Sequence, residues 1–496
     1  MAEQGVTNLL IRRQDSYDQM NADLVALATA MSHGEANPDE GVHFVAIMGD
    51  GAAAFLQGLN PVLERIGPDY QAEIIGSMGY SRGEDKCMGP SRAIGNPAAL
   101  RGLTFAVYLR DGDWNILVKL ANDNGIPVNP DETTFDPNAI NVMAADDYLH
   151  AATLYNTNAS ENRPVVENGR RTGRSQTVHA DGVCTWTPGD VNIARGRGGL
   201  VSLASTYEYS EQMPNTLIGI RRWNRENSAL VEGMLTAIFM AGDQVKTSPQ
   251  ALQRAAEISA VVYNEEDAAY WLRYFNRVTE TDSTGLSVSL GGSYVNNYAD
   301  NQQLFGLLPG STNRFAIVYR AFGDIVVRMY PNLVSSYPPV NDVVNTTYLR
   351  NIAPRFAQVA TAPVETPRFE MAPSRESQVV ARRNWSIQFQ TGSATFTPEA
   401  IATLQELCDG LTVASNLAVE VHGHTDNAGG NDANMELSES RAFAVRTWLQ
   451  QNAPDIFPDG RIRVYPHGEE QPIAPNSNEE GRARNRRVEI VMRENR

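Results

Sequence analysis

Residues 423–429 read Gly-His-Thr-Asp-Asn-Ala-Gly and form a polar loop directly after the most regular strand pattern of the chain. In that strand, residues 417–421, apolar side chains alternate with others, which is typical of a strand with one buried face. A helical pattern over residues 397–411 precedes it, and two further strand patterns follow at residues 461–465 and 487–492. The order predicts an α+β sandwich at the C-terminal end of the chain.

The loop and the helix after it carry an anion and a cation. Asp426 lies in the loop, and Arg441 follows 15 residues later. Ser438 is the expected N-cap of the helix, which would put Arg441 in the first turn, where backbone N–H groups also attract a carboxylate. A carboxylate and a guanidinium together suit a ligand that carries an ammonium and a carboxylate. The alternative is that Asp426 caps the loop and Arg441 forms a surface ion pair.

Residues 389–492 resemble the OmpA-like peptidoglycan-binding domain over its whole length. The resemblance implies that Asp426 and Arg441 clamp the diaminopimelate of the peptidoglycan stem peptide, and that Thr425 and Asn434 lie in the same site. It rests on three blocks in the family's order: Gly-His-Thr-Asp at 423–426, Asn434 with Leu-Ser at 437–438 and Arg-Ala at 441–442, and Gly-Arg-Ala-Arg-Asn-Arg-Arg-Val-Glu at 481–489.

Three other polar residues near the loop have structural interpretations. Arg487 is expected to support the fold or the rim of the site. His422 and His424 fit packing at the end of the strand, because no third metal ligand is evident in the sequence. We therefore predict no metal site, no cofactor and no catalytic residue in this domain.

Four prolines between residues 352 and 380 predict an extended linker. It separates a long domain, residues 1–351, from the C-terminal domain, residues 381–496. In the long domain, apolar runs at 43–48, 72–75 and 103–109 each end at a turn, and helical patterns follow the first and the third. Strand, turn and helix in this order predict βαβ units and a parallel sheet, with ligands at the carboxyl ends of its strands.

The long domain resembles periplasmic solute-binding proteins of the nitrate, sulfonate and taurine type. The resemblance rests on residues 100–107, 181–188 and 213–228. It implies two α/β lobes that close on a small ligand, with chain crossings near residues 109 and 200. Residues 81–90 and 111–115, and the segments 1–40 and 280–350, depart from the family's pattern.

A cleft between such lobes would be lined by the turns that follow the strands. Backbone N–H groups at residues 49–51 and 79–81 would suit an anion, whereas Asp111 and Asp113 would favour a cationic or hydroxyl-bearing ligand. The alternatives are structural: a turn residue at 50, an N-cap at 113 and a core tryptophan at 114. The candidate cleft residues are Asp50, Tyr80, Ser81, Trp114, Asn115 and Trp186.

Composition limits the partners and the location. The 496 residues include 41 Lys and Arg against 58 Asp and Glu, a net charge of −17, which argues against nucleic acid as a partner. The sequence contains no run of 18 apolar residues, so we predict no membrane-spanning helix. The N-terminus, residues 1–5, shows no signal peptide. Cys87, Cys184 and Cys408 show no disulfide or metal-ligand spacing and are expected to be small buried side chains.

Three functions fit this sequence. The first is a non-catalytic protein of the periplasm or cell envelope that binds peptidoglycan and presents a domain for a small solute. The second is a structural component of an envelope machine or phage particle, with partners in that assembly and a repurposed solute-binding fold. The third is an enzyme that uses Cys87 and Glu84, although no histidine partner is identifiable for them. We predict the first, without cofactor.

Overall fold

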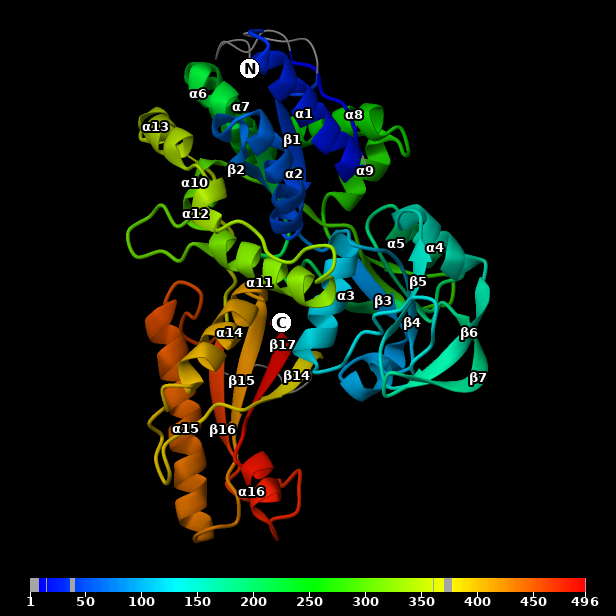
Figure 1. Ribbon diagram of the computed structural model, residues 1–496, viewed down its shortest axis with the longest axis vertical. Coiled ribbons are helices and arrows are strands. Elements are labelled where there is room, and N and C mark those ends of the chain that lie inside the picture. The colour runs from blue at the N-terminus through cyan, green and yellow to red at the C-terminus, as the bar shows by residue number, and fades with distance from the viewer. Residues whose placement is uncertain (1–8, 15, 36–40, 360, 370–376, 496) are drawn as a thin grey trace. The chain divides into compact units, whose positions relative to one another are not determined.

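The computed structural model describes residues 9–14, 16–35, 41–359, 361–369 and 377–495 (Figure 1). Residues 1–5, on which the signal-peptide prediction depends, lie outside these ranges, as do linker residues 370–376. The chain divides into two compact units. Unit 1 contains residues 1–84, 211–278 and 290–365, and unit 2 contains residues 85–210, 279–289 and 366–496.

Unit 1 is built on a four-stranded sheet. Its order is β1 (Phe44–Met48), β10 (Pro214–Ile220), β2 (Ala72–Ser81) and β13 (Ser293–Val295). Every neighbouring pair is antiparallel. The predicted strand, helix and strand are present as β1, α2 (Ala52–Ile66) and β2, but β10 lies between the two strands. The predicted parallel sheet is therefore wrong for unit 1, because pairing with a strand more than 130 residues away leaves no local pattern.

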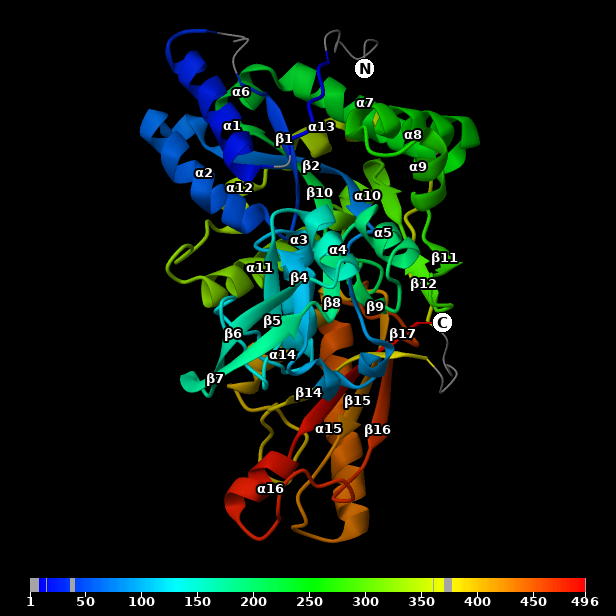
Figure 2. The same ribbon diagram turned by 90° about the vertical axis from the view of Figure 1, so that its right-hand side faces the viewer.

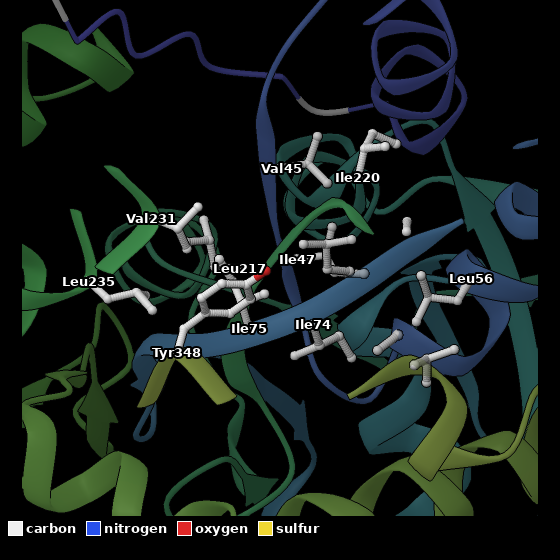
Figure 3. Packing of buried hydrophobic residues seen from close by; sticks show 14 of the residues in the cluster. Val45, Ile47, Leu56, Ile74, Ile75, Leu217, Ile220, Val231, Leu235 and Tyr348 are labelled. Carbon is white, nitrogen blue, oxygen red and sulfur yellow. The ribbon is translucent and has the colours of Figure 1, made fainter. Parts of the chain in front are cut away.

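Helices supply the rest of the unit 1 core. Figure 3 shows Ile47, Ile74 and Leu217 from the sheet beside Leu56 of α2 and Leu235 of α7, and all five are buried. Each such side chain contributes about 1.5–3 kcal/mol through burial. The helices are α1 (Tyr17–Ser32), α2, α6 (Arg221–Glu226), α7 (Ser228–Thr247), α8 (Pro249–Tyr263), α9 (Ala268–Tyr274), α10 (Tyr298–Leu304), α11 (Arg314–Met329), α12 (Val340–Val343) and α13 (Thr347–Phe356).

Strand β2 continues through the residues for which the sequence predicted a turn. A Cβ at Gly79 would lie 2.5 Å from the carbonyl oxygen of Tyr294, so glycine is what lets β13 approach this strand. The N–H of Ser81 donates to Met213 at 3.4 Å, and the N–H of Gly49 donates to Pro214 at 2.8 Å. The predicted anion-binding turn at residues 79–81 is wrong, because these residues belong to the sheet ladder.

The first part of unit 2 has a five-stranded mixed sheet. Its order is β5 (Asn141–Ala145), β4 (Thr104–Tyr108), β8 (Gly182–Thr185), β3 (Lys86–Gly89) and β9 (Val201–Ser205). Strand β4 pairs in parallel with β5 and β8, and the pairs β8–β3 and β3–β9 are antiparallel. Because β3 and β4 both belong to this sheet, the chain changes unit after Glu84 and returns at Glu211, whereas the resemblance implied crossings near 109 and 200.

Shorter elements complete this part of the unit. Strands β6 and β7 form a separate two-stranded ribbon, and β11 and β12 form another. Figure 2 shows β6 and β7 side by side. The remaining elements are α3 (Gly112–Asp123), α4 (Tyr148–Asn156), β6 (Ser160–Glu167), β7 (Arg170–His179), α5 (Gly189–Arg195), β11 (Val278–Thr281) and β12 (Ser287–Leu290), with short 3-10 turns at Pro68–Tyr70, Ser91–Ala93 and Pro97–Leu100.

Two of the three cysteines are joined. Cys87 and Cys184 face each other across the antiparallel pair β3 and β8 and form a disulfide, although they lie 97 positions apart in sequence. Cys408 is free and buried. The prediction that all three are unpaired buried side chains is wrong for the first two, because strand register, and not sequence spacing, brings them together.

The last part of unit 2 is an α+β domain. Its sheet has the order β14 (Val379–Trp385), β17 (Val488–Glu494), β15 (Leu417–Gly423) and β16 (Ile462–Pro466). Helix α15 (Asn431–Asn452) packs on β15 and β16, and α14 (Ala400–Val413) packs on α15, while α16 (Glu479–Asn485) precedes the last strand. The predicted helix at 397–411 and the predicted strands at 417–421, 461–465 and 487–492 are present, whereas the helix after the loop begins earlier than predicted.

The fully buried Arg461 ties these elements together. Its guanidinium donates to the carbonyl oxygens of Leu417 (3.1 Å), Ile456 (2.6 Å), Leu411 (2.7 Å) and Ala414 (2.8 Å). These acceptors lie at the end of α14, the start of β15 and the segment before β16. A buried cation is stable here because each of its three nitrogens has an acceptor.

Two sequence predictions change at element boundaries. Helix α15 begins at Asn431, so Ser438 is not its N-cap and Arg441 lies in its third turn. The Oγ of Ser438 instead donates to the carbonyl oxygen of Met435. The start of the predicted linker, residues 352–356, is the end of helix α13, where Ile352 and Phe356 are buried. In the described part of the chain, no helix is both long and apolar enough to cross a membrane.

Candidate peptidoglycan-binding site

Asp426 lies in the loop between β15 and α15 and is 8% exposed. Its Oδ1 accepts a hydrogen bond from the N–H of Ala428 at 3.0 Å, which forms a tight turn. Its Oδ2 accepts one from the guanidinium of Arg486. Both oxygens are therefore held, and the carboxylate has a single fixed orientation.

Arg441 lies nearby on α15 and is 6% exposed. Its Nε donates to the carbonyl of Ser393 at 3.1 Å, and its guanidinium lies 5.0 Å from the ring centre of Phe389. Burial lowers the pKa of Arg441 and the charge of Arg486 lowers it further, while Asp426 opposes both. Among the described residues, the two terminal nitrogens of Arg441 have no hydrogen-bond partner, so a planar fork of donors remains for a carboxylate.

Arg486 is the site residue that the sequence reasoning missed. It follows α16 directly and donates to both Asp426 and Glu479. Although burial works against the charged form, hydrogen bonds to Glu479 and Asp426 raise the pKa of Arg486. The block at 481–489 contains four arginines, and sequence spacing alone does not show which one meets Asp426. That depends on where α16 ends.

Thr425 and Asn434 join the same cluster. The N–H of Thr425 donates to Gly468 at 2.8 Å, and its buried Oγ1 has no partner among the described residues. The Asn434 amide donates to the backbone carbonyl of Asp426 at 3.2 Å and to the carboxylate of Glu469. The structure thus brings together the four residues that the sequence predicted. Arg487 instead binds Asn384 of β14 at 3.1 Å.

Three of the six cleft candidates lie in unit 1. Asp50 is buried and accepts a hydrogen bond from the Gln212 amide at 3.0 Å. The Tyr80 hydroxyl, also buried, donates to Glu211 at 3.1 Å, and burial raises its pKa well above the usual value. Ser81 is the last residue of β2. Tyr80 borders a small polar cavity, which Arg82, Glu211, Tyr294, Asp300 and Arg314 also line.

The other three candidates lie in unit 2. Trp114 and Asn115 are buried in the first turn of α3. Trp186 follows β8 and packs edge-on against Tyr148 with ring centres 4.7 Å apart. The burial of Trp114 agrees with its alternative as a core residue, and the role of all three residues in a ligand site remains a prediction. Among the described residues, no group of three or more His, Cys, Asp or Glu is arranged to hold a metal ion.

Comparison with known proteins gives a match at this site. Residues 388–486 match the model of the OmpA family. The chain is 41% identical over 107 residues to the probable lipoprotein YiaD of Escherichia coli K12, a match that covers 22% of this chain and 48% of that protein. It is 34% identical over 131 residues to the peptidoglycan-binding protein ArfA of Mycobacterium tuberculosis, covering 26% and 39%.

Solved structures match over the same fraction of the chain. The cell wall anchor of the type VI secretion system of Pseudomonas aeruginosa is 31% identical, covering 24% of this chain and 81% of that structure, with a TM-score of 0.21. This chain spans about half or less of the length of the curated relatives named above. The family match identifies the C-terminal domain as OmpA-like and assigns no family to the residues before it.

Proposed function

We propose that this protein binds peptidoglycan in the cell envelope through its C-terminal domain and has no catalytic activity. The ligand is the stem peptide, recognised at its diaminopimelate residue. The observation that carries the proposal is the pair of unpartnered terminal nitrogens on Arg441, held within electrostatic reach of the oriented Asp426 carboxylate.

The charges at the site match the ligand. Diaminopimelate presents an ammonium and a carboxylate on one short side chain. Asp426 would accept the ammonium, while the fork of Arg441 would bind the carboxylate through two parallel hydrogen bonds. Arg486 orients Asp426 and adds a second positive charge beside the ligand's carboxylates. The unpaired Thr425 hydroxyl is a further donor for the ligand.

Calorimetric titration of the full chain with a diaminopimelate-containing stem tripeptide tests this proposal. Asp426→Asn and Arg441→Gln should each weaken binding at least tenfold, because each leaves one charged group of the ligand unpaired. Arg484→Gln, an exposed arginine of α16, is the matched control and should bind normally. Unchanged binding in both site variants would falsify the clamp.

For the long N-terminal region, we propose a receptor for a small polar solute with a two-lobed solute-binding fold. The polar cavity beside Tyr80 supports this role. There Glu211 accepts hydrogen bonds from Tyr80 at 3.1 Å and from Arg314 at 2.8 Å, so anionic and cationic groups line the same space. Groups of both signs suit a zwitterionic ligand such as an amino acid.

A thermal-shift screen of the full chain against amino acids, sulfonates and polyamines tests the receptor. A ligand at 100 times its dissociation constant should stabilise its domain by about 2.7 kcal/mol. Glu211→Gln should remove the shift. If no compound shifts the transition, the alternative gains support: a structural component of an envelope machine or phage particle that keeps the fold and uses the C-terminal domain as its wall anchor.

A further inference from the structure

Three histidine rings lie in one column at the edge of the C-terminal sheet. His467 stacks on His422 with ring centres 5.1 Å apart and an angle of 2° between planes, and on His424 at 4.8 Å and 15°. Tyr465 stacks on the other side of His422 at 4.9 Å and 18°. The rings come from β15, β16 and the residues just after them. Such a column places three ionisable groups within contact distance.

The hydrogen bond between two of these rings depends on their protonation. Nδ1 of His422 and Nε2 of His467 are 2.8 Å apart. One nitrogen has to carry the proton and the other has to accept it. When both rings are protonated, two N–H groups and two positive charges face each other, and the bond is lost. The contact is therefore compatible with at most one added proton.

Charged groups of both signs surround the column. Glu420 of β15 lies 3.3 Å from Nε2 of His422 and pairs with Arg493 of β17. Glu489 of β17 lies 3.7 Å from Nε2 of His424 and pairs with Arg382 of β14. Arg487, directly before β17, is also charged and opposes protonation of His424 and His467. Burial and the neighbouring histidines lower the pKa of His467 to about 4.

His467 belongs to the turn that holds the candidate site. Its N–H donates to Gly423 at 3.0 Å, and the next residue, Gly468, accepts from the N–H of Thr425 at 2.8 Å. The N–H of Gly468 donates to Ser438 on α15 at 3.0 Å. Glu469 then accepts from the Asn434 amide. Displacement of His467 therefore disturbs the backbone beside Asp426.

We infer that the His422–His467 pair is a proton-sensitive latch, and that its double protonation loosens the turn at residues 467–469 and weakens stem-peptide binding. The inference rests on the proposed function of the C-terminal domain. Only the latched form holds Thr425 and Asn434 in place, so the apparent dissociation constant rises as the latched fraction falls.

The test compares the full chain with His467→Gln between pH 7.5 and 4.0, by calorimetric titration with the stem tripeptide. A glutamine amide keeps a donor and an acceptor but does not titrate. Between pH 7.5 and 4.0 the wild type should lose at least twofold more affinity than the variant, because only the wild type has a pair of rings that can both take up protons. His179→Gln changes an exposed histidine of β7 and should follow the wild type.

Amide exchange at Thr425 and Gly468, measured by NMR on the wild-type chain, gives a readout without ligand or mutation. After correction for the intrinsic pH dependence of amide exchange, the protection of these amides should fall with the same midpoint as the His467 ring titration. Equal pH dependence of binding in wild type and His467→Gln, or constant protection of these amides, overturns the latch. Absence of binding at pH 7.5 together with pH-dependent protection overturns the proposed function and supports the latch alone.

Discussion

The carboxylate of Asp426 accepts a hydrogen bond from the guanidinium of Arg486, which lies 60 residues later in the chain. The sheet brings the loop after β15 close to the end of α16, since β15 and β17 are neighbours in it. Without ligand, the Asp426 carboxylate is therefore already paired with the guanidinium of Arg486.

The first prediction concerns this pair. Arg486→Gln should weaken stem-peptide binding about tenfold, because Asp426 loses the bond that orients it and the site loses one positive charge. Calorimetric titration of the full chain checks it. Arg482→Gln, whose arginine binds Glu479 from the same helix, should leave the affinity within a factor of two. Tighter binding in Arg486→Gln would show that Arg486 competes with the ligand's ammonium instead.

The second prediction concerns the buried Arg461. Arg461→Lys should destabilise the C-terminal domain by about 3 kcal/mol or more, because a single ammonium cannot reach four carbonyl oxygens and leaves some of them unsatisfied. Hydrogen exchange of peptides from residues 379–495 in increasing urea measures the loss. The exposed Arg484→Lys is the control and should change stability by less than about 0.5 kcal/mol.

The third prediction compares two glycines of the same domain. A Cβ at Gly423 would lie 2.1 Å from the carbonyl oxygen of Ser438, whereas a Cβ at Gly410 would meet nothing within 4 Å. Gly423→Ala should cost about 3 kcal/mol, since the clash is with backbone. Gly410→Ala, inside α14, should stabilise by roughly 0.5–1 kcal/mol. Urea unfolding followed by hydrogen exchange separates the two, and equal effects would contradict the close approach of β15 and α15.

The fourth prediction concerns the disulfide. In denatured, unreduced protein, one of the three cysteines, Cys408, should react with an alkylating reagent. Replacing Cys87 and Cys184 together by serine should destabilise the first part of unit 2 by roughly 2–5 kcal/mol. Mass spectrometry counts the alkylated thiols, and hydrogen exchange of peptides from residues 85–210 measures the stability. Three reactive thiols before reduction would exclude the bond.

Local patterns predicted many elements well. Helix α2 follows the helical spacing at residues 52–66, and Ser248 caps α8 through a hydrogen bond to Ala251, as its position before Pro249 suggests. The prediction for α15 was wrong because the polar residues 431–437 contain no helix-breaking side chain, and packing on β15 and β16 extends the helix over them. The intrinsic helix propensity of these residues is a weak signal, so tertiary contacts decide where the helix begins.

The sequence by itself determined the class of the C-terminal domain through its resemblance to a known family, and that resemblance predicted that Asp426, Thr425, Asn434 and Arg441 form one site. Such a resemblance depends on residue type and short spacing, which the sequence shows directly. The tertiary structure decided the long-range partners: Arg486 on Asp426, Cys87 on Cys184, β10 between β1 and β2, and the stacked histidines. Such pairings depend on strand register between residues far apart in the chain, and a local pattern carries no information about register.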